Sequence, residues 1–272
     1  MNPGCYTKRK KIMVLGIIWV AFQVALLAHS ELRGLGDNFA PHRDLSTVEA
    51  TLFGGSPPAW LQTHAPDSLR YWLDFGGFMN HAFWFAFPLI LGFAVTRKAP
   101  HQLGPYFLWI VTVSVLADLV FVVIPVSPPW MHEGVARTLT DRSFGHYVNV
   151  DDNQFAAFPS MHAALPATLG FFFLLRTPEA RKLAWLSFGY ALSVGISVVY
   201  LGEHWLLDVL GGYALACVTA FLLWHPGLLR LYSKLPGDPM GRMERINRGL
   251  MPAPEAPEVI PFPTPEAVPE AA

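Results

Sequence analysis

Two short stretches of this chain hold side chains that could transfer protons or attack an electrophile. They are residues 158–162 (Phe-Pro-Ser-Met-His) and residues 202–208 (Gly-Glu-His-Trp-Leu-Leu-Asp). Each stretch opens a long apolar segment, and the chain between them is long enough to cross a bilayer and return. Two histidines and an aspartate can therefore meet at one face of a membrane. Ionisable residues at such depths cost free energy, and for that reason they are usually functional.

The second stretch has the spacing of a nucleophile and its partner. His204 and Asp208 are separated by four residues, so they share one face of the first turn of a helix. Asp208 can then accept a hydrogen bond from Nδ1–H of His204, which fixes the tautomer and leaves Nε2 free to attack phosphorus. The alternative interpretation of this pair alone is a solvated His–Asp pair at the end of a membrane span.

The first stretch has the features of an anion site with an acid built in. Pro159 is well placed as the first residue of a helix. The N–H groups of Ser160, Met161 and His162 would then lack intrahelical partners, and the helix dipole would add positive character. The Ser160 hydroxyl is a further donor, and the His162 imidazole can transfer a proton. A Pro-Ser helix cap beside an interfacial histidine explains the same residues equally well.

The elements that must position these residues are membrane helices. Of the 272 residues, 53% are hydrophobic and 14% are charged, whereas a soluble domain carries about a quarter charged residues. The charges cluster between apolar runs of about 20 residues, the length that crosses roughly 30 Å of hydrocarbon. We predict an all-α, polytopic membrane bundle with six spans, at about 12–29, 72–95, 104–125, 159–176, 182–201 and 206–224.

The domain organisation follows from these spans. Residues 1–234 form one six-span catalytic domain, and a Pro-rich cytoplasmic tail at 235–272 is predicted to be disordered. In the first long loop, residues 45–60 could lie on the membrane surface as an amphipathic segment. Asp118 falls inside the third span, with Asn80 and His81 of the second span as candidate partners. These three could line a head-group cavity or form a structural interhelical hydrogen bond.

The distribution of Lys and Arg predicts the orientation. With a cytoplasmic N-terminus, 14 of the 19 basic residues lie on the cytoplasmic side, and the other five are Arg33, Arg43, Arg70, Arg137 and Arg142. The positive-inside rule therefore predicts a multi-pass protein of the plasma (cytoplasmic) membrane with both termini in the cytoplasm. Both histidines and Asp208 would face outward. The net charge of −1 argues against nucleic acid as a partner.

The paired motifs resemble those of a known family. Pro159-Ser160-x-His162 and His204-x3-Asp208 are similar to the second and third signature motifs of the type 2 phosphatidic acid phosphatase superfamily, and the resemblance covers roughly residues 72–225. It implies that His204 is the nucleophile, which forms a phosphohistidine, and that Asp208 orients it. It also implies that His162 protonates the leaving oxygen and that Ser160 binds phosphate.

The chain departs from the family pattern at its basic residues. The first motif, Lys-x6-Arg-Pro, is absent, since the chain contains no Arg-Pro dipeptide. The Ser-Arg of the third motif is Ser197-Val198 here. These departures, together with Gly211-Gly212 and the Pro-Pro-Trp element at 128–130, resemble the branch that contains the inositol phosphorylceramide synthases and related inositolphosphotransferases.

Other positive charges must therefore balance the phosphate during transfer. Arg137 and Arg142 are the candidates for phosphate binding, because they lie in the outer loop before His162 and because guanidinium groups bind phosphate in a bidentate manner. The alternative is that these two arginines simply pair with Glu133 and Asp141.

The predicted function is that of an integral-membrane lipid phosphotransferase or phosphatase that works through phosphohistidine. Its substrate would be a lipid phosphate or phosphodiester, and its acceptor inositol, another alcohol or water, with no cofactor and no metal. Two alternatives belong to other classes. One is a metal enzyme that uses the two histidines and the aspartate as ligands, and the other is a non-catalytic lipid-binding or transport protein.

Overall fold

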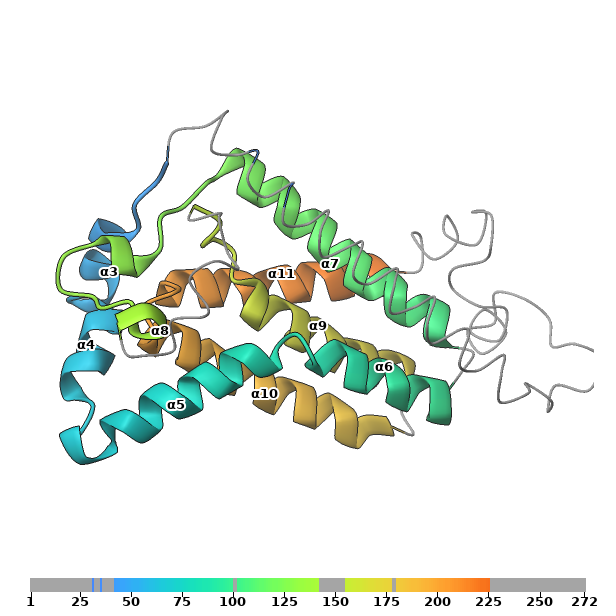
Figure 1. The fold of residues 1–272 in the computed structure, drawn as a ribbon. Coiled ribbons are helices and arrows are strands. Elements are labelled where there is room, and N and C mark those ends of the chain that lie inside the picture. The colour runs from blue at the N-terminus through green and yellow to red at the C-terminus, as the bar shows by residue number, and fades with distance from the viewer. Residues whose placement is uncertain are drawn as a thin grey trace, which may run out of the picture.

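The computed structural model describes residues 31, 35, 42–99, 102–141, 155–177 and 180–225, and in these ranges the chain is built from helices (Figure 1). In chain order they are α3 (Ser46–Phe53), α4 (Pro57–His64), α5 (Asp67–Phe83), α6 (Phe87–Lys98), α7 (Leu103–Val123), the 3-10 turn η2 (Pro129–Met131), α8 (Thr138–Asp141), α9 (Met161–Arg176), α10 (Arg181–Tyr200) and α11 (Leu206–Trp224). The all-α prediction is confirmed for the described part of the chain.

Several of these helices can cross a membrane. Helices α7, α10 and α11 are each long and apolar enough, and α5 with α6 qualifies as one span bent by 49°. Helix α9 is apolar but has only 16 residues, so it extends roughly 24 Å. The protein is therefore a multi-pass membrane protein. The count of six stays a prediction, because the first predicted span, like the Pro-rich tail, lies outside the described residues.

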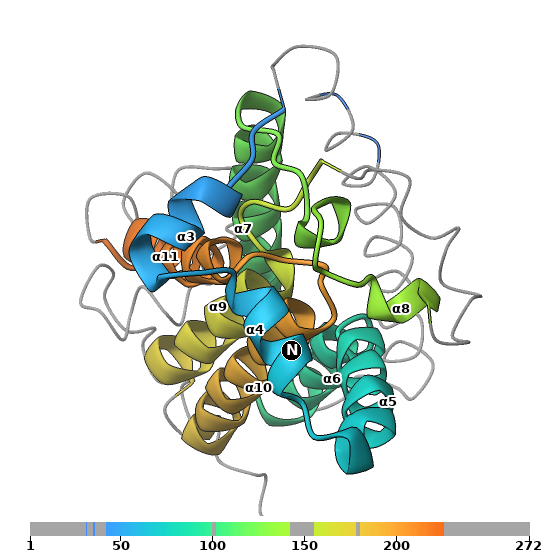
Figure 2. The same cartoon turned by 90° about the vertical axis from the view of Figure 1, so that its left-hand side faces the viewer.

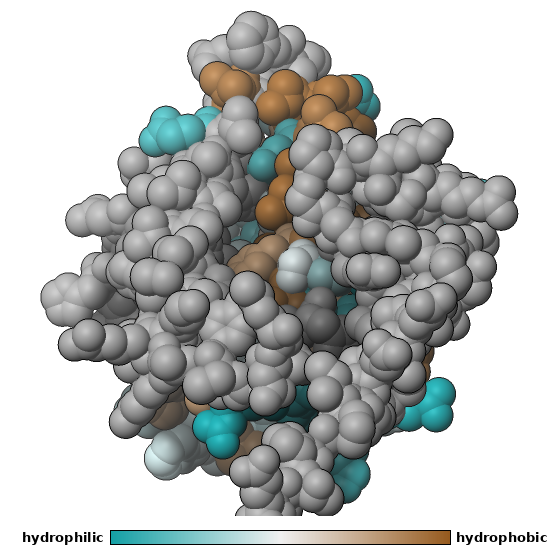
Figure 3. All heavy atoms as spheres, turned by 90° about the vertical axis from the view of Figure 1, so that its right-hand side faces the viewer, coloured by the Kyte–Doolittle hydropathy of each residue, from teal (hydrophilic) through white to brown (hydrophobic). Residues whose placement is uncertain are grey.

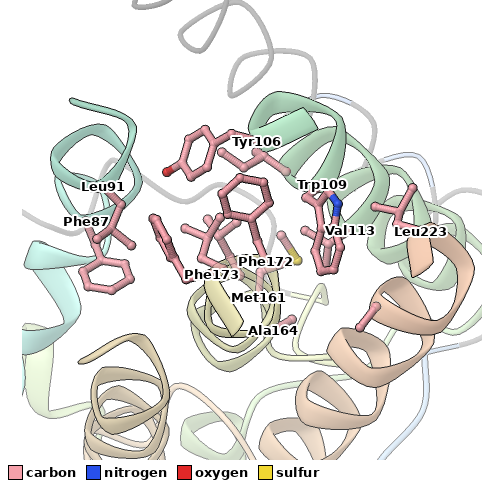
Figure 4. Close-up of a cluster of buried hydrophobic side chains, with 14 of the residues drawn as sticks. Phe87, Leu91, Tyr106, Trp109, Val113, Met161, Ala164, Phe172, Phe173 and Leu223 are labelled. Atoms are coloured by element: carbon pink, nitrogen blue, oxygen red, sulfur yellow. The ribbon is translucent and has the colours of Figure 1, made fainter. Parts of the chain in front are cut away.

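Helix α9 lies in the middle of the bundle, where α6, α7, α10 and α11 all pack against it (Figure 2). Small residues allow this close packing. At Gly170, for example, a Cβ atom would lie 2.6 Å from the Phe188 ring of α10. On the other side of α9, Phe172 and Phe173 meet Tyr106 and Trp109 of α7 in a buried aromatic cluster (Figure 4). Helix α9, which is shorter than α7, α10 and α11, is thus the most enclosed of these four helices.

The two ends of the bundle differ. The first turns of α9 and α11 lie at one end, together with the short helices α3, α4 and α8 (Figure 1). The opposite end carries the basic residues at the end of α6 and the start of α10, Arg97, Lys98, Arg181 and Lys182, and hydrophilic side chains are visible at the margins of that face (Figure 3). This agrees in direction with the charge asymmetry used to predict the orientation.

Three extended segments lie side by side over the end that carries α3. The backbone N–H of Arg43 donates to Pro125, and that of Ser127 donates back to Arg43. On the other side of the same strand-like segment, the N–H of Val126 donates to Phe155, and that of Ala157 donates to Val126. We call these segments, 42–45, 125–128 and 155–157, the backbone strap. It joins the first long loop to the residues just before α9.

Candidate active site

The two predicted motifs meet at the end of the bundle that carries the strap. His162 is the second residue of α9, and His204 lies two residues before α11. The Nδ1 atom of His162 is 3.1 Å from the Nε2 atom of His204, which is a hydrogen-bond distance. The structure therefore brings both imidazoles to one point, within reach of a single phosphoryl group.

The orientation of His204 is fixed mainly by a backbone carbonyl. Its Nδ1 atom lies 2.9 Å from the oxygen of Ala157 and 3.5 Å from Oδ2 of Asp208. Since a carbonyl oxygen can only accept, Nδ1 carries the proton, and the neutral ring has its lone pair on Nε2. The expected tautomer is thus present, but the strap supplies the nearer acceptor. Asp208, which is fully buried, adds its negative charge at ion-pair distance.

The start of α9 differs from the prediction in one respect. The helix begins at Met161 with Ser160 as its N-cap, and Pro159 precedes it in a cis peptide bond with Phe158. The prediction that Pro159 is the first residue of this helix is therefore wrong. The N–H of Ser160 donates to the carbonyl oxygen of Asp208 at 2.9 Å, so it is not available to an anion. This bond ties the two motifs together directly.

The hydroxyl of Ser160, unlike its backbone N–H, remains available to a ligand. The residue is fully buried, and its Oγ atom has no hydrogen-bond partner among the residues that the structure describes. A buried hydroxyl without a partner costs free energy until a ligand or water satisfies it. The close approach of α11 encloses this group, because a Cβ atom on Gly212 would lie only 2.4 Å from the Ser160 carbonyl oxygen. Close packing against residues 158–160 thus explains why residues 211 and 212 are both glycine.

Arg137 lies beside the nucleophile motif but is already paired. Its Nε and Nη2 atoms donate to the two carboxylate oxygens of Glu203 at 2.8 and 3.2 Å. Its guanidinium also stacks over Trp130, 4.4 Å from the ring centroid. Arg137 therefore contacts the residue next to His204, which the sequence did not indicate. Arg142 lies outside the described residues.

Two comparisons find relatives of known type. The family model described as "PAP2 superfamily" matches residues 43–222, about two thirds of the chain. The chain belongs to the PAP2 superfamily. Inositol phosphorylceramide synthase catalytic subunit aur1 of Schizosaccharomyces pombe is 27% identical over 202 residues, which cover 65% of this chain and 45% of that protein. The chain thus spans less than half the length of this relative. No solved structure matches.

Membership in the PAP2 superfamily confirms the resemblance drawn from the two motifs. The match also begins at Arg43, well before the start near residue 72 that the motifs indicated. The PAP2 domain therefore includes α3, α4 and the first segment of the backbone strap. These elements are parts of the site's framework and not a mere connection between spans.

The PAP2 domain brings His81 of α5 to the site. The His81 ring lies 4.4 Å from the His162 ring, centroid to centroid, and is almost completely buried. The Trp84 ring packs on the His162 ring at 5.1 Å, and its Nε1 donates to the carbonyl oxygen of Met161. The expected partner of Asp118, Asn80, instead donates to Ser193 and Ser197 of α10. Of these two residues of α5, His81 is therefore the one that contacts a predicted site residue, His162.

Glu49 of α3 reaches the opposite side of the PAP2 site, and sequence reasoning missed it. Its Oε1 atom accepts from the backbone N–H of Leu207 at 2.8 Å. The local pattern Ser46-x-x-Glu49 is typical of a capping box within one helix, so nothing nearby in sequence indicates a contact with a helix more than 150 residues away. Among the described residues, no three His, Cys, Asp or Glu side chains are arranged as they would be around a metal ion.

A cavity of about 630 Å³, lined by polar and apolar residues, lies next to the loop that holds Arg137. Its lining comes from α4, the start of α5, the end of α10 and the residues on either side of Arg137, and includes Gln62, Thr63, Arg70, Ala136, Thr138 and Tyr200. The Gln62 side chain fixes one wall, because it donates to the carbonyl oxygens of Ala136 and Tyr200 and accepts from the Ala136 N–H.

Proposed function

We propose that this protein is a membrane phosphotransferase or phosphatase that acts on a lipid phosphate or phosphodiester through a phosphohistidine at His204. The observation that carries the proposal is the 3.1 Å separation between Nδ1 of His162 and Nε2 of His204. A nucleophile and a proton donor of one reaction must both reach the same phosphoryl group. The shared hydrogen bond means that a substrate phosphoryl group enters between the two rings and replaces it.

The proposed reaction has two steps. In the first, Nε2 of His204 attacks phosphorus, the bond to the lipid oxygen breaks, and His162 gives that oxygen a proton. In the second, the oxygen of the acceptor attacks phosphorus, its proton passes to His162, and the nitrogen–phosphorus bond breaks. Asp208 stabilises the positive ring of His204 in the first step, as a carboxylate does for other catalytic histidines.

Several groups are proposed to hold the phosphate. The buried Ser160 hydroxyl lacks a partner among the described residues, and the first N–H groups of α9 add the positive end of a helix dipole. Arg137 is proposed to contribute charge from the edge of the site, where Glu203 now holds it. Arg142, which follows α8 in sequence, is the second proposed cation.

The acceptor is proposed to be inositol or another alcohol, with water as the simpler choice. The relative in Schizosaccharomyces pombe is named as an inositol phosphorylceramide synthase, which supports transfer over hydrolysis. The cavity next to the loop that holds Arg137 is the proposed entry for the acceptor. We further propose that the site faces outward from the plasma membrane, with both termini in the cytoplasm. The positive-inside rule supports this orientation, because it places 14 of the 19 basic residues on the cytoplasmic side.

The test is a lipid panel assayed with the purified full-length protein. Phosphorus-labelled donors are incubated with and without candidate alcohols, so that transfer and hydrolysis give different products. We expect turnover by the natural protein, an acid-labile label on His204, and full activity in chelator. The His204→Ala variant should lose activity, while His64→Ala, which removes an exposed histidine of α4, should keep it.

Three results would overturn the proposal. Activity of His204→Ala above a few per cent would exclude this nucleophile, and recovery that depends on an added metal would favour the His/Asp metal enzyme. Vanadate binding without turnover of any lipid would favour a non-catalytic lipid-binding or transport protein.

A further inference from the structure

Glu49 occupies a place where a carboxylate is costly. It lies on α3, a short helix outside the apolar spans, and its neighbours Val48, Leu52 and Phe53 are 44%, 62% and 45% exposed. Glu49 itself is 0% exposed. Burying a carboxylate costs free energy unless hydrogen bonds or charges compensate it. Glu49 is the one fully buried residue of α3, while the apolar side chains of this helix are exposed. This is the reverse of ordinary burial and calls for a compensating partner.

That partner is the first turn of α11. The Oε1 atom of Glu49 accepts from the N–H of Leu207, the second residue of the helix, at 2.8 Å. Asp208 accepts from the N–H of Trp205, the N-cap, at 2.7 Å. Helix-start N–H groups have no intrahelical partners and carry the positive end of the dipole. Two carboxylates from different helices therefore hold the turn that follows His204 and carries Asp208.

Glu49 is held in place by the backbone strap. The strap begins at Arg43, whose backbone pairs with residues 125 and 127, and it ends at Ala157, whose carbonyl oxygen accepts from His204. Leu45, at the junction of the strap and α3, packs against the buried cluster that contains Trp205. The same small unit thus fixes both Glu49 and the acceptor for Nδ1 of His204.

We propose that Glu49 is a positioning residue of the His204–Asp208 pair, which holds the first turn of α11 and places a second negative charge behind Asp208. This inference rests on the proposed function, in which His204 is the nucleophile. A second carboxylate nearby stabilises positive charge on the His204 ring. Glu49 does not touch the substrate, so it acts only through Asp208 and His204.

The charge of Glu49 is expected to change near neutral pH. Burial raises the pKa of its carboxyl group from 4.5 to about 7, the N–H groups of Leu207 and Leu206 oppose this, and the charge of Asp208 adds to it. Between these two pH values the folded protein holds a proton that an unfolded chain would release. The contribution of Glu49 to stability is therefore lost as the pH rises from about 4.5 through 7. Asp208 is the ionisable side chain that acts on Glu49 across this contact.

The experiment follows His204 by two independent readouts in the full-length protein. The first is the pH dependence of its modification by diethyl pyrocarbonate, measured by peptide mass spectrometry, because only the neutral ring reacts. The second is kcat and KM for the lipid that the panel identifies. The variants are Glu49→Gln, which keeps an oxygen acceptor for Leu207 but removes the charge, and Glu49→Ala, which removes both. Glu133→Gln removes an exposed glutamate at the same end of the bundle and is the matched control.

We expect Glu49→Gln to move the midpoint of His204 modification to lower pH and to reduce kcat about threefold, and Glu49→Ala to reduce kcat about ten- to 100-fold. KM for the lipid should stay close to that of the natural protein, and Glu133→Gln should change nothing. An unmoved midpoint in Glu49→Gln would overturn the proposal, even if Glu49→Ala fails to fold. The absence of lipid turnover in the natural protein would instead overturn the proposed function, while the modification midpoint still decides the role of Glu49.

Discussion

The first turns of α9 and α11 are two helix starts at one site that are used in different ways. At α11, carboxylates occupy the N–H groups of Trp205 and Leu207. At α9, one N–H group is tied to the carbonyl oxygen of Asp208, and the hydroxyl of Ser160 is buried without a described partner. Both turns have the same dipole, but only α9 offers donors that an anion could still use.

One end of the bundle can therefore hold both the proposed nucleophile and a phosphate, each at its own helix start. The carboxylates at α11 repel phosphate from that helix start by like charge, and they hold the turn that follows His204, the proposed nucleophile. The start of α9 combines a donor-rich turn with His162, the proposed proton donor. The carbonyl of Asp208 and the N–H of Ser160 join the two turns, so their relative positions are fixed. The following predictions test this division of roles.

The largest effect should come from the α11 turn. Asp208→Asn should lower kcat by about 1,000- to 10,000-fold, because an amide cannot stabilise a positive imidazole ring. The measurement is kcat at saturating lipid, with size-exclusion chromatography to verify the fold. Asp67→Asn is the matched control, since the Asp67 side chain is 96% exposed at the start of α5. A loss of kcat below tenfold would contradict the proposal that the first turn of α11 positions and stabilises the His204 ring.

The proton donor at α9 should matter according to the leaving group. His162→Ala should lower kcat about 100-fold or more on an alkyl lipid phosphate, whose alkoxide leaves poorly without a proton. On an aryl phosphate with an acidic phenol as leaving group, the loss should be far smaller. Both substrates are measured with the same protein preparation, so that a loss of folded protein would lower both rates equally. Equal losses on both would mean that His162 acts in binding or in structure and not as an acid.

Replacing Ser160 should weaken the binding of an anion without lowering the stability of the ligand-free protein. Ser160→Ala should weaken vanadate binding about tenfold, because a donor to the anion is lost. It should leave the Tm of the ligand-free protein unchanged or raise it, because a buried hydroxyl without a partner is removed. Thr168→Val is the matched control, because the Thr168 hydroxyl, about two turns further along α9, is also buried without a described partner. This variant should bind vanadate with the affinity of the natural protein. Similar vanadate affinities for the natural protein and Ser160→Ala would rule out the phosphate role of Ser160.

The smallest effect concerns the pair beside the nucleophile. Arg137→Gln should lower the free energy of unfolding by about 2 kcal/mol, because it leaves the mostly buried carboxylate of Glu203 without its partner. The double variant with Glu203→Gln should recover most of this stability, as measured by thermal unfolding in detergent. Vanadate affinity then isolates the contribution of Arg137 to phosphate binding. A double variant less stable than Arg137→Gln would show that Glu203 is held by other contacts.

Sequence reasoning succeeded where the signal is local. The spacing of His204 and Asp208 predicted that their side chains approach each other, although His204 precedes the first turn of α11 and does not lie on it. The apolar runs predicted α7, α10 and α11 to within a few residues. It failed at Pro159, which was expected inside the helix and lies outside it, because the fixed φ of proline does not decide which residue is the cap. It also did not indicate the contact of Arg137 with Glu203, because these two residues are near each other only in the fold.

The sequence by itself determined the chemistry available to this protein: an apolar bundle, two helix starts at one face, and the residues of two PAP2 motifs. The bundle and its helix starts follow from hydrophobic runs and from periodicity, which act over one or two turns of chain, and the motifs follow from their resemblance to the family. The tertiary structure alone decided which groups hold the nucleophile, namely the Ala157 carbonyl and Glu49, and which ring lies against the acid, namely His81. Contacts between segments more than 40 residues apart depend on how helices pack, and no local pattern encodes them.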